Sequence, residues 1–598
     1  MLALSLLVAA PARAADPQGY AVSLTGVTGE IAAVMRESSQ LFLLREAGPL
    51  PPFALVMRAR EDVPRLRTVL DSFGYYQGAV ALTVAGLNPE DPDLPARLED
   101  MPAATEAPVA IAITLGPLYR LNRITLEGIE PADHLGALGV AKGDPAAAAP
   151  VLDGALRLQG ALQDRGHALA RVDAPEAWAD DEAHTLDLIY KVAAGPQVAL
   201  GDIRVSGLSR VRENFVRGAL TVKPGEPYRP QRIEEARRTL AGLGVFSGVS
   251  VRADDSLAPD GRLPLTFEVT ERPRRAVAFA GSYSTDLGVT LSASWSHRNL
   301  FGNAEQLNLS AAGSGLGNAS AGLGYNLRAQ YVEPFFRHPD QVLDVSLTAV
   351  KQQLDTYDQT AQTLTALVRR KFSTLWSASA GASFAYNFVE QQGASQLYKL
   401  FSLPLGGAYD STGIADAIRD PLTGLRAQLS LTPTYAFGGG DFFYGVTQLS
   451  ASTYVDLFDD GRSVLAFRGL AGRAFGVSSL SLPPDQRLYV GGSGTVRGYA
   501  YQSLGSQFPD GTPAGGTAAA ALTAEWRQRI FGDWGGAVFV DAGQGGDEFF
   551  DGRLYIGAGA GVRYYTPIGA IRADIAVPLV ARPGAGAFQI YIGLGQAF

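Results

Sequence analysis

A two-residue alternation in the C-terminal half of the chain limits its fold more than any other feature. In the last stretch, residues 588–598, large apolar side chains stand at 588, 590, 592, 594 and 598, and glutamine, tyrosine, glycine and alanine lie between them. Similar stretches of roughly ten residues, bounded by turn residues, recur back to Pro273. Because neighbouring side chains of a strand point to opposite faces, we predict strands with one apolar and one small or polar face.

Strands of this kind suit an antiparallel transmembrane β-barrel, whose apolar face meets lipid and whose other face lines the lumen. A soluble β-sandwich also alternates, but it buries its apolar face and needs less glycine, whereas this chain has 69 glycines. At roughly 20 residues for a strand and its turn, residues 273–598 would form about 16 strands, an even number, although the arithmetic alone also allows about 14 or 18.

The beginning of the chain indicates export. Residues 1–10 are apolar, and Ala12-Arg13-Ala14 resembles a cleavage site, so we expect a signal peptide over residues 1–14, although a positively charged start is missing. The alternative is a buried first strand or helix. No later stretch reaches the roughly 18 apolar residues of a membrane-spanning helix. We expect a barrel in the bacterial outer membrane, with the preceding residues in the periplasm.

Between the two regions, strands alternate with amphipathic helices in three copies. Gly116-Pro117 recurs as Gly195-Pro196, and residues 124–128 (ITLEG) recur at the same offset as residues 203–207 (IRVSG). One predicted helix has apolar positions at helical spacing, namely Val151, Leu152, Ala155, Leu158 and Leu162. We predict three repeats of strand, helix, helix, strand, strand, over residues 20–117, 118–196 and 197–272.

Two motifs in the barrel region carry a resemblance to a known family. Residues 491–499 (GGSGTVRGY) resemble the conserved loop-six motif of the barrel assembly and translocation superfamily, and residues 539–543 (FVDAG) resemble its second barrel motif. Members of this family carry periplasmic POTRA domains, which match the repeats. The resemblance implies a lumen loop motif made of Val496, Arg497, Gly498 and Tyr499.

Within the superfamily, four further segments resemble the TamA branch, the outer-membrane subunits of the translocation and assembly module. These segments are 74–77 (GYYQ), 282–288 (SYSTDLG), 534–541 (WGGAVFVD) and 591–595 (YIGLG). Three repeats also favour this branch, because the BamA branch usually has five and the two-partner secretion branch two.

The resemblance implies a factor that helps to insert or secrete β-barrel and autotransporter-type proteins. Its implied partners are client outer-membrane polypeptides, the lipid bilayer and a TamB-like protein anchored in the inner membrane. Two alternatives stay open, a two-partner secretion transporter for one dedicated substrate and a passive outer-membrane pore.

Arg497 needs an anion if its glycine-rich loop folds into the lumen, because the guanidinium is then removed from water. Strand parity places Glu525, Arg527 and Arg529 on the inward face, and Asp541 as well. We therefore expect Arg497 to pair with Glu525 or Asp541, which would hold the loop against the inner wall. The alternative is a solvated outer loop in which Arg497 has no partner.

Glycines in the closing strand predict a weak barrel seam. Gly593 and Gly595 give up side-chain packing, so the last strand would pair poorly with the first, and the seam could open toward a client strand. The alternative is that these glycines make room for lumenal side chains such as Tyr591. The predicted seam residues are Val277, Phe279, Gly281, Tyr283, Gly593, Gly595 and Phe598.

Several other functions find no support in the sequence. The chain has no cysteine, its five histidines are scattered, and no nucleophile elbow or nucleotide-binding loop appears, so we expect no metal site, no cofactor and no enzymatic activity. Residues 557–561 (GAGAG) superficially resemble a nucleotide loop but lie inside an alternating strand. The formal net charge is −9 without a basic block, so we expect no nucleic-acid partner.

Overall fold

The computed structural model describes residues 19–47, 50–102, 105–317, 322–414, 420–438, 440–567, 569–583 and 585–595. The expected signal peptide over residues 1–14 and the seam residue Phe598 lie outside this part of the chain. The chain divides into two compact units; the first holds the first two repeats, the second holds the barrel, and residues of the third repeat belong to both.

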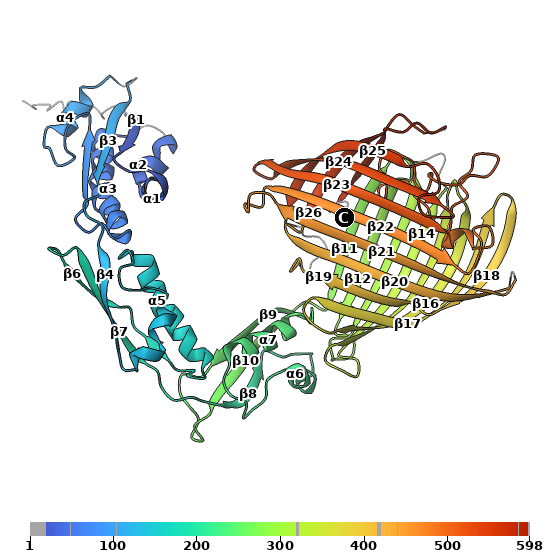
Figure 1. Cartoon of the computed structure of the whole chain (residues 1–598), viewed down its shortest axis with the longest axis horizontal. Helices are drawn as coiled ribbons and strands as arrows, with labels where there is room; N and C mark the ends of the chain where they lie inside the picture. The colour runs from blue at the N-terminus through green and yellow to red at the C-terminus, as the bar shows by residue number, and fades with distance from the viewer. Residues whose placement is uncertain are drawn as a thin grey trace, which may run out of the picture. The chain divides into compact units, whose positions relative to one another are not determined.

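Each N-terminal repeat combines a small sheet with helices (Figure 1). The first sheet has the order β1-β3-β2, with β1 parallel and β2 antiparallel to β3. Its elements are β1 (Tyr20–Thr25), α1 (Gly29–Ser38), α2 (Gln40–Leu43), α3 (Pro52–Ser72), β2 (Ala79–Val84), α4 (Leu94–Glu99) and β3 (Ala107–Thr114). A core of apolar side chains lies between this sheet and its helices.

The second and third repeats vary the same plan. The second sheet has the order β4-β7-β5, and β6 pairs with β7 as an additional strand. Its elements are β4 (Arg120–Glu127), α5 (Ala148–Asp164), β5 (Arg171–Val172), β6 (Glu176–Asp180) and β7 (Thr185–Ala193). The third sheet has the order β8-β10-β9. Its elements are β8 (Leu200–Ser206), α6 (Glu213–Ala219), α7 (Pro230–Ala241), β9 (Phe246–Ala253) and β10 (Leu263–Glu271).

Helix α5 follows the predicted apolar spacing with one exception. Val151, Ala155, Leu158 and Leu162 are buried, but Leu152 is 52% exposed. Leu152 directly follows Val151, about 100° around the helix, and so falls on the solvent face.

The C-terminal region forms the closed antiparallel barrel that the alternation predicted (Figure 1). Strands β18 and β19 are two segments of one strand, because both pair with β17 on one side and with β20 on the other. The interruption falls at Leu403-Pro404, where proline has no N–H for the ladder. The barrel therefore has 16 strands, which confirms the predicted number.

The barrel strands in chain order are β11 (Arg275–Ser284), β12 (Gly288–Arg298), β13 (Gln306–Leu316), β14 (Gly324–Pro334), β15 (Gln341–Gln353), β16 (Asp358–Lys371), β17 (Trp376–Gln391), β18 (Ala394–Ser402), β19 (Leu405–Asp410), β20 (Gly424–Phe437), β21 (Phe442–Asp456), β22 (Ser463–Phe475), β23 (Ala518–Phe531), β24 (Trp534–Gly546), β25 (Tyr555–Thr566), β26 (Gly569–Pro578) and β27 (Gln589–Leu594).

Burial alternates along these strands as the sequence pattern predicted. In β23, Leu522 and Trp526 are exposed on the outer face, whereas Glu525 and Arg527 are buried on the inner face. Large exposed apolar side chains are frequent on the barrel strands, as a wall that faces lipid requires.

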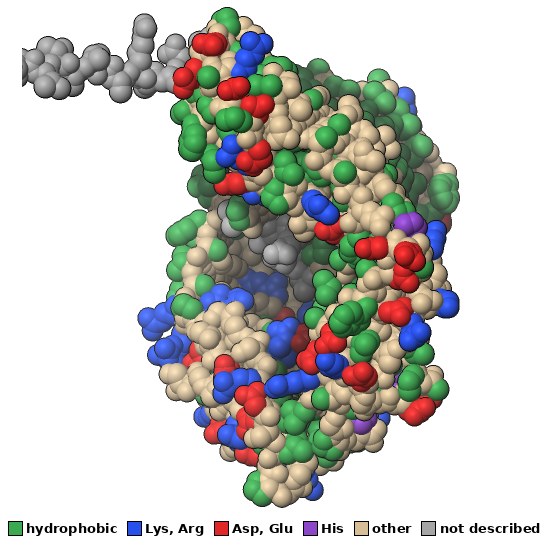
Figure 2. All heavy atoms as spheres, turned by 90° about the vertical axis from the view of Figure 1, so that its left-hand side faces the viewer, with side chains coloured by type: hydrophobic (Ala, Val, Ile, Leu, Met, Phe, Trp, Pro, Cys, Tyr) green, Lys and Arg blue, Asp and Glu red, His purple; other side chains and the backbone are tan. Residues whose placement is uncertain are grey.

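Basic and acidic side chains are both spread over the molecular face shown in Figure 2. Among the described residues, no helix combines the length and apolar character needed to span a bilayer.

A buried carboxylate fixes the helices of the first repeat and gives a test of this part of the fold. Asp62 in α3 accepts hydrogen bonds from the Ser39 hydroxyl at 2.6 Å and from the backbone N–H groups of Gln40 and Leu41 at 3.0 Å each. Asp62→Ala leaves these buried donors without acceptors and should destabilise the repeat by about 2–4 kcal/mol.

Limited proteolysis of the purified full-length protein should therefore cut the first repeat faster in Asp62→Ala. Glu61→Ala is the matched control, because Glu61 is the exposed neighbour on the same helix. Equal cleavage rates in the two variants would contradict a structural role for Asp62.

Candidate functional site

The loop between β22 and β23, residues 476–517, carries the predicted motif and contacts the inner wall of the barrel. Four of its apolar side chains, Val490, Val496, Tyr499 and Leu504, form a small buried cluster. The Tyr499 hydroxyl lies 2.9 Å from the Ile556 carbonyl oxygen and 2.8 Å from that of Val580. These contacts hold the loop inside the barrel and not on a solvated outer surface.

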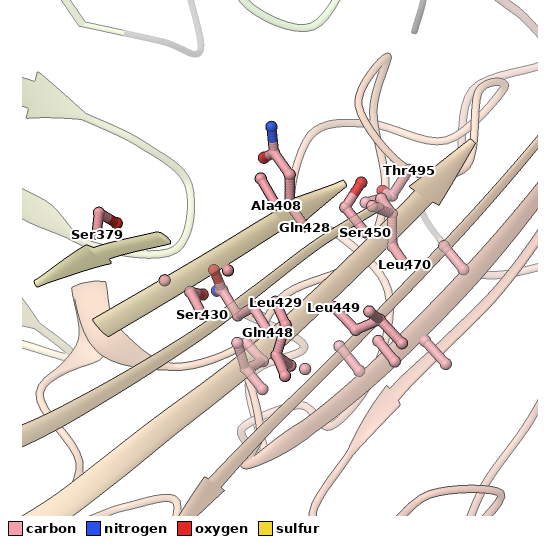
Figure 3. Close-up of a pocket in the computed structure, with 18 of the residues that line it drawn as sticks. Ser379, Ala408, Gln428, Leu429, Ser430, Gln448, Leu449, Ser450, Leu470 and Thr495 are labelled. Atoms are coloured by element: carbon pink, nitrogen blue, oxygen red, sulfur yellow. The ribbon is translucent and has the colours of Figure 1, made fainter. Parts of the chain in front are cut away.

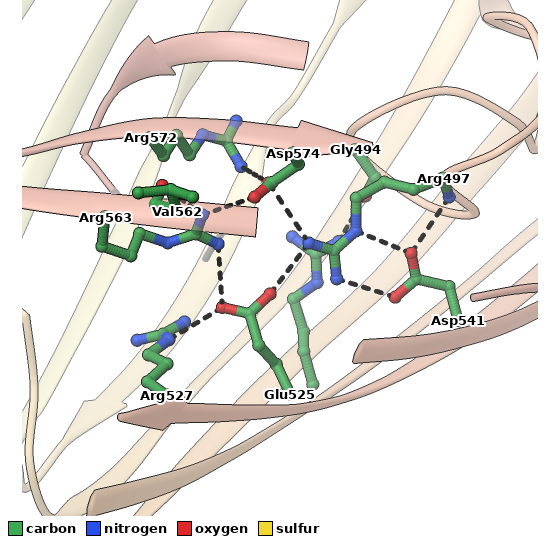
Figure 4. A network of polar contacts seen from close by, with 10 residues as sticks. Gly494, Arg497, Glu525, Arg527, Asp541, Val562, Arg563, Arg572 and Asp574 are labelled. Carbon is green, nitrogen blue, oxygen red and sulfur yellow. Dashed lines mark hydrogen bonds and ion pairs between the residues drawn. The ribbon is translucent and has the colours of Figure 1, made fainter. Parts of the chain in front are cut away.

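Arg497 is the charged centre of this loop (Figure 4). Its Nε and Nη2 donate to the two carboxylate oxygens of Asp541 at 2.7 and 3.0 Å, and its Nη1 donates to Glu525 Oε2 at 2.8 Å. Its backbone N–H also donates to Asp541, at 3.0 Å. The structure thus brings Arg497 together with both carboxylates singled out from the sequence, and its side chain is only 2% exposed.

Further charges extend this network along the inner wall (Figure 4). Asp574 on β26 lies 3.6 Å from Arg497 and also pairs with Arg563 on β25. Arg527 donates to Glu525 at 2.9 Å, and the Arg497 guanidinium carbon lies 3.3 Å from the ring centre of Phe539. The loop cation therefore contacts carboxylates on three strands and an aromatic face, which is a strong arrangement for a buried guanidinium.

Alternate glycines on β25 give the loop and the network their space. A Cβ atom on Gly557 would lie 1.9 Å from the Arg497 carbonyl oxygen, one on Gly559 would lie 2.5 Å from the Phe539 ring, and one on Gly561 would lie 1.9 Å from Asp574. The segment 557–561 therefore lies in a strand, as its alternation predicted, and its glycines form a trough for the loop.

The barrel seam is the second part of the site. β11 pairs with β12 along all ten of its residues, but with β27 at only two positions, Tyr283–Ile592 and Ser284–Tyr591. The Thr285 N–H adds one bond to the Ile590 carbonyl, at 3.1 Å. Within the described residues, β11 therefore has no partner from β27 over positions 275–282.

Gly595 directly follows the last residue of β27. Its φ of 83° lies in the left-handed region, and its N–H donates to Ala570 of β26 at 2.7 Å, so β27 ends at Leu594. A Cβ atom on Gly593 would lie 3.8 Å from Arg572 Nε and 4.0 Å from Ser282 Cβ, so the glycine leaves space between these side chains. The part of β11 that has no partner among the described residues of β27 carries Val277 and Phe279, of which Phe279 is 80% exposed. Gly281 and Tyr283 lie farther along the same strand.

Tyr591 connects the loop with the seam. Its hydroxyl accepts from the Gly498 N–H at 3.2 Å and lies 3.4 Å from the Tyr499 carbonyl, while its backbone is paired with Ser284. The last strand therefore contacts the loop motif through one buried side chain.

A cavity of about 500 Å³ lies beside the loop, between loop residues and the inner wall (Figure 3). Uncharged polar side chains of β20 and β21 line it together with Thr495 of the loop; these include Gln428, Ser430, Gln448 and Ser450. Among the residues that line it, Arg369 carries the one formal charge.

Sequence reasoning found the central pair but not the whole network. The parity of Asp574 and Arg563 and the motif around Phe539 were evident from the sequence. Nothing in it showed that Asp574 and Phe539 contact Arg497, or that Arg563 pairs with Asp574 and Glu525. Arg529, expected inward with Glu525 and Arg527, lines a pocket with Arg527 near the end of β23, where its side chain is exposed and its guanidinium lies 4.2 Å from the ring centre of Tyr565.

Comparison with known proteins agrees with this geometry. The family model described as "Omp85 superfamily domain" matches residues 299–598, half of the chain. The chain belongs to the Omp85 superfamily. The POTRA model, described as "Surface antigen variable number repeat", matches residues 198–272. As a member of this superfamily, the protein is an outer-membrane β-barrel with N-terminal periplasmic POTRA sequence.

Individual relatives are distant. The outer membrane protein assembly factor BamA of Neorickettsia risticii is 24% identical over 522 residues, which are 81% of this chain and 66% of that protein. The chain spans 61–66% of the length of the first three curated relatives.

Two solved structures share the fold of this Omp85 protein. BamA from Haemophilus ducreyi, in a form that lacks POTRA domains 1–3, has a TM-score of 0.64 at 18% identity, with 80% of this chain and all of that chain covered. CdiB from Acinetobacter baumannii has a TM-score of 0.51 at 15% identity, with 80% and 90% covered.

Replacement of Arg497 tests the loop attachment. Arg497→Ala leaves Glu525 and Asp541 buried without their partner and should weaken the loop's attachment by about 3–5 kcal/mol. Arg497→Lys keeps the charge but loses the two-oxygen contact with Asp541, so its effect should be intermediate. Protease added to intact cells should cut the loop fastest in Arg497→Ala.

Arg473→Ala is the control for this experiment, because Arg473 pairs with Glu548 at 2.8 Å in a solvated contact worth about 0–1 kcal/mol. Cleavage of the Arg497→Ala loop at the control rate would show that the buried pairs do not hold the loop.

Gly557→Ala tests the trough without changing any charge. The new methyl group would overlap the Arg497 carbonyl, so the loop must shift and should become protease-sensitive while the barrel stays folded. Gly313→Ala on β13 is the matched control, since a Cβ there meets nothing within 4 Å. Unchanged loop protection in Gly557→Ala would mean that the strand relaxes around the methyl group.

Proposed function

We propose that this Omp85 protein is a TamA-type subunit that helps to insert or translocate outer-membrane polypeptides through its seam, without covalent catalysis. The observation that carries the proposal is the contact between β11 and β27, which consists of two residue pairs within the part of the chain that the structure describes. A strand edge without a partner presents free backbone groups to which an incoming strand can add.

The distribution of interactions supports a seam that opens in preference to other barrel contacts. β26 and β27 share six residue pairs, and β11 and β12 share ten, so the pairing of β11 with β27 is the shortest of the three. The open edge starts where β11 leaves the third repeat, on the periplasmic side from which a client would arrive. Val277, Phe279 and Gly281 lie along it.

The proposed assignment to the TamA branch includes the domains and the partner. We infer POTRA domains over residues 20–117, 118–196 and 197–272 and a barrel over 273–598, and the three sheets described above support these boundaries. A TamB-like inner-membrane-anchored protein is the proposed partner. Neither the BamA relatives nor CdiB bears the name of an enzyme, which fits a role without catalysis.

A disulfide across the seam tests the proposal, and the absence of natural cysteines makes the result unambiguous. A Cβ on Gly593 would lie 4.0 Å from the Ser282 Cβ, which suits the Cβ separation of a disulfide. Oxidised S282C/G593C should stop the assembly of client barrels in cells, and reductant should restore it.

A matched lock placed elsewhere controls for the disulfide itself. Ala293 and Ala311 lie opposite each other on β12 and β13. The A293C/A311C disulfide therefore links two strands whose pairing the proposed mechanism does not require to open. Normal assembly with the oxidised S282C/G593C protein would overturn the seam proposal. Large, stable conductance of the unmodified protein in planar bilayers would favour the passive pore.

A further inference from the structure

A second, separate site lies at the periplasmic end of the inner wall. Strands alternate in direction around the barrel, so β22 begins and β23 ends at the rim where β11 begins. A pocket of about 370 Å³ opens there between the ends of β22, β23, β25 and β26 and the segment before β20. Its polar lining includes Asp420, Arg462, Arg527, Arg529, Tyr565 and Thr566.

Two arginines of this pocket are available to a ligand. Arg462 and Arg529 are exposed, and within the described part of the chain neither forms an ion pair. Arg527, deeper in the pocket, already pairs with Glu525, and Asp420 contributes one opposing charge. The described lining therefore has more positive than negative charge, and its accessible cations are guanidinium groups that match a two-oxygen anion.

The two arginines are held in place before any ligand arrives. The Arg529 guanidinium lies 4.2 Å from the ring centre of Tyr565. The backbone N–H of Arg529 donates to the backbone carbonyl of Arg462 at 2.7 Å. Arg462 Nη2 donates in turn to the Ile530 carbonyl at 3.2 Å. Such contacts limit the side-chain freedom that binding would otherwise have to remove.

The position of the pocket favours a polypeptide over a membrane lipid as its occupant. Its deeper lining, Val464, Arg527 and Ala570, is buried on the lumen side. The lipid-facing side chains next to Arg527 and Ala570 in sequence, Trp526 and Ile571, are exposed on the opposite face of the wall. A ligand therefore reaches the pocket from the periplasmic mouth, as a client would.

We propose that this pocket binds a carboxylate of an acidic segment of a client polypeptide at the periplasmic mouth of the barrel. The inference rests on the proposed function, because it assumes polypeptide clients. It adds a docking point that engages the client by charge, at a distance from the backbone edge of β11.

The test measures binding of a short fluorescent peptide with two glutamates to full-length protein in phosphatidylcholine nanodiscs. The R462Q/R529Q protein should bind it about tenfold more weakly than the unmodified protein, and added salt should weaken binding. R553Q is the matched control, because Arg553 lies 5.9 Å from Tyr555 at the other end of β25. It should bind like the unmodified protein.

Several outcomes would overturn the proposal. A peptide with glutamines in place of glutamates that binds equally well would exclude carboxylate recognition, as would unchanged affinity in R462Q/R529Q. Loss of peptide binding in phosphatidylglycerol nanodiscs, together with displacement by inorganic phosphate, would assign the pocket to a lipid phosphate instead.

One comparison separates this proposal from the seam proposal. Oxidised S282C/G593C protein should bind the glutamate peptide as well as the reduced form, because docking does not require the seam to open. If the protein binds the peptide and the oxidised S282C/G593C form still assembles clients, the docking site is retained and the seam mechanism is removed. Absence of peptide binding, together with an oxidised S282C/G593C disulfide that stops client assembly, would remove the docking site and retain the seam mechanism.

Discussion

The rest of the lumen depends on the burial of one guanidinium group. Arg497 has lost nearly all contact with water, and a buried cation without anions would cost several kcal/mol. Glu525, Asp541 and Asp574 supply those anions from β23, β24 and β26. Each carboxylate would itself be costly inside the barrel without a cation, so the position of the loop and the composition of the wall stabilise each other.

This mutual dependence reaches the seam through Tyr591. The side chain of Tyr591 contacts the backbone of Gly498 and Tyr499, next to Arg497, while its own backbone forms one of the two pairs with β11. A shift of the loop would remove the hydroxyl's partners and leave a buried polar group unsatisfied, which costs about 1–3 kcal/mol. Tyr591 therefore contacts the loop motif and the seam at the same time.

Local periodicity was sufficient to predict the barrel and the inward parity of Glu525 and Asp541, because burial on one face imposes a two-residue pattern, and the length of the region gave the approximate number of strands. The two-residue pattern could not predict that Asp574 and Arg563 belong to the site, because their contacts follow from how the closed barrel places β25 and β26 beside the loop. Arg529 keeps its predicted inward parity at the rim of the barrel, whereas the extent of seam pairing follows from how β27 closes against β11 and has no local sequence signal.

The seam also combines two opposing requirements. An exposed, apolar strand edge favours unwanted pairing, and proteins usually cover or shorten such edges. Among the described residues, β27 offers β11 no partner over positions 275–282, where Phe279 is exposed, while β27 is held by six pairs to β26 and by Tyr591 to the loop. The strand that would have to move, β27, is thus attached to β26 and to the loop, whereas β11, which would receive a client, has two pairs with the described part of β27. In the proposed gate, an incoming strand could add to β11 first and compete for only two existing pairs, so opening need not precede binding.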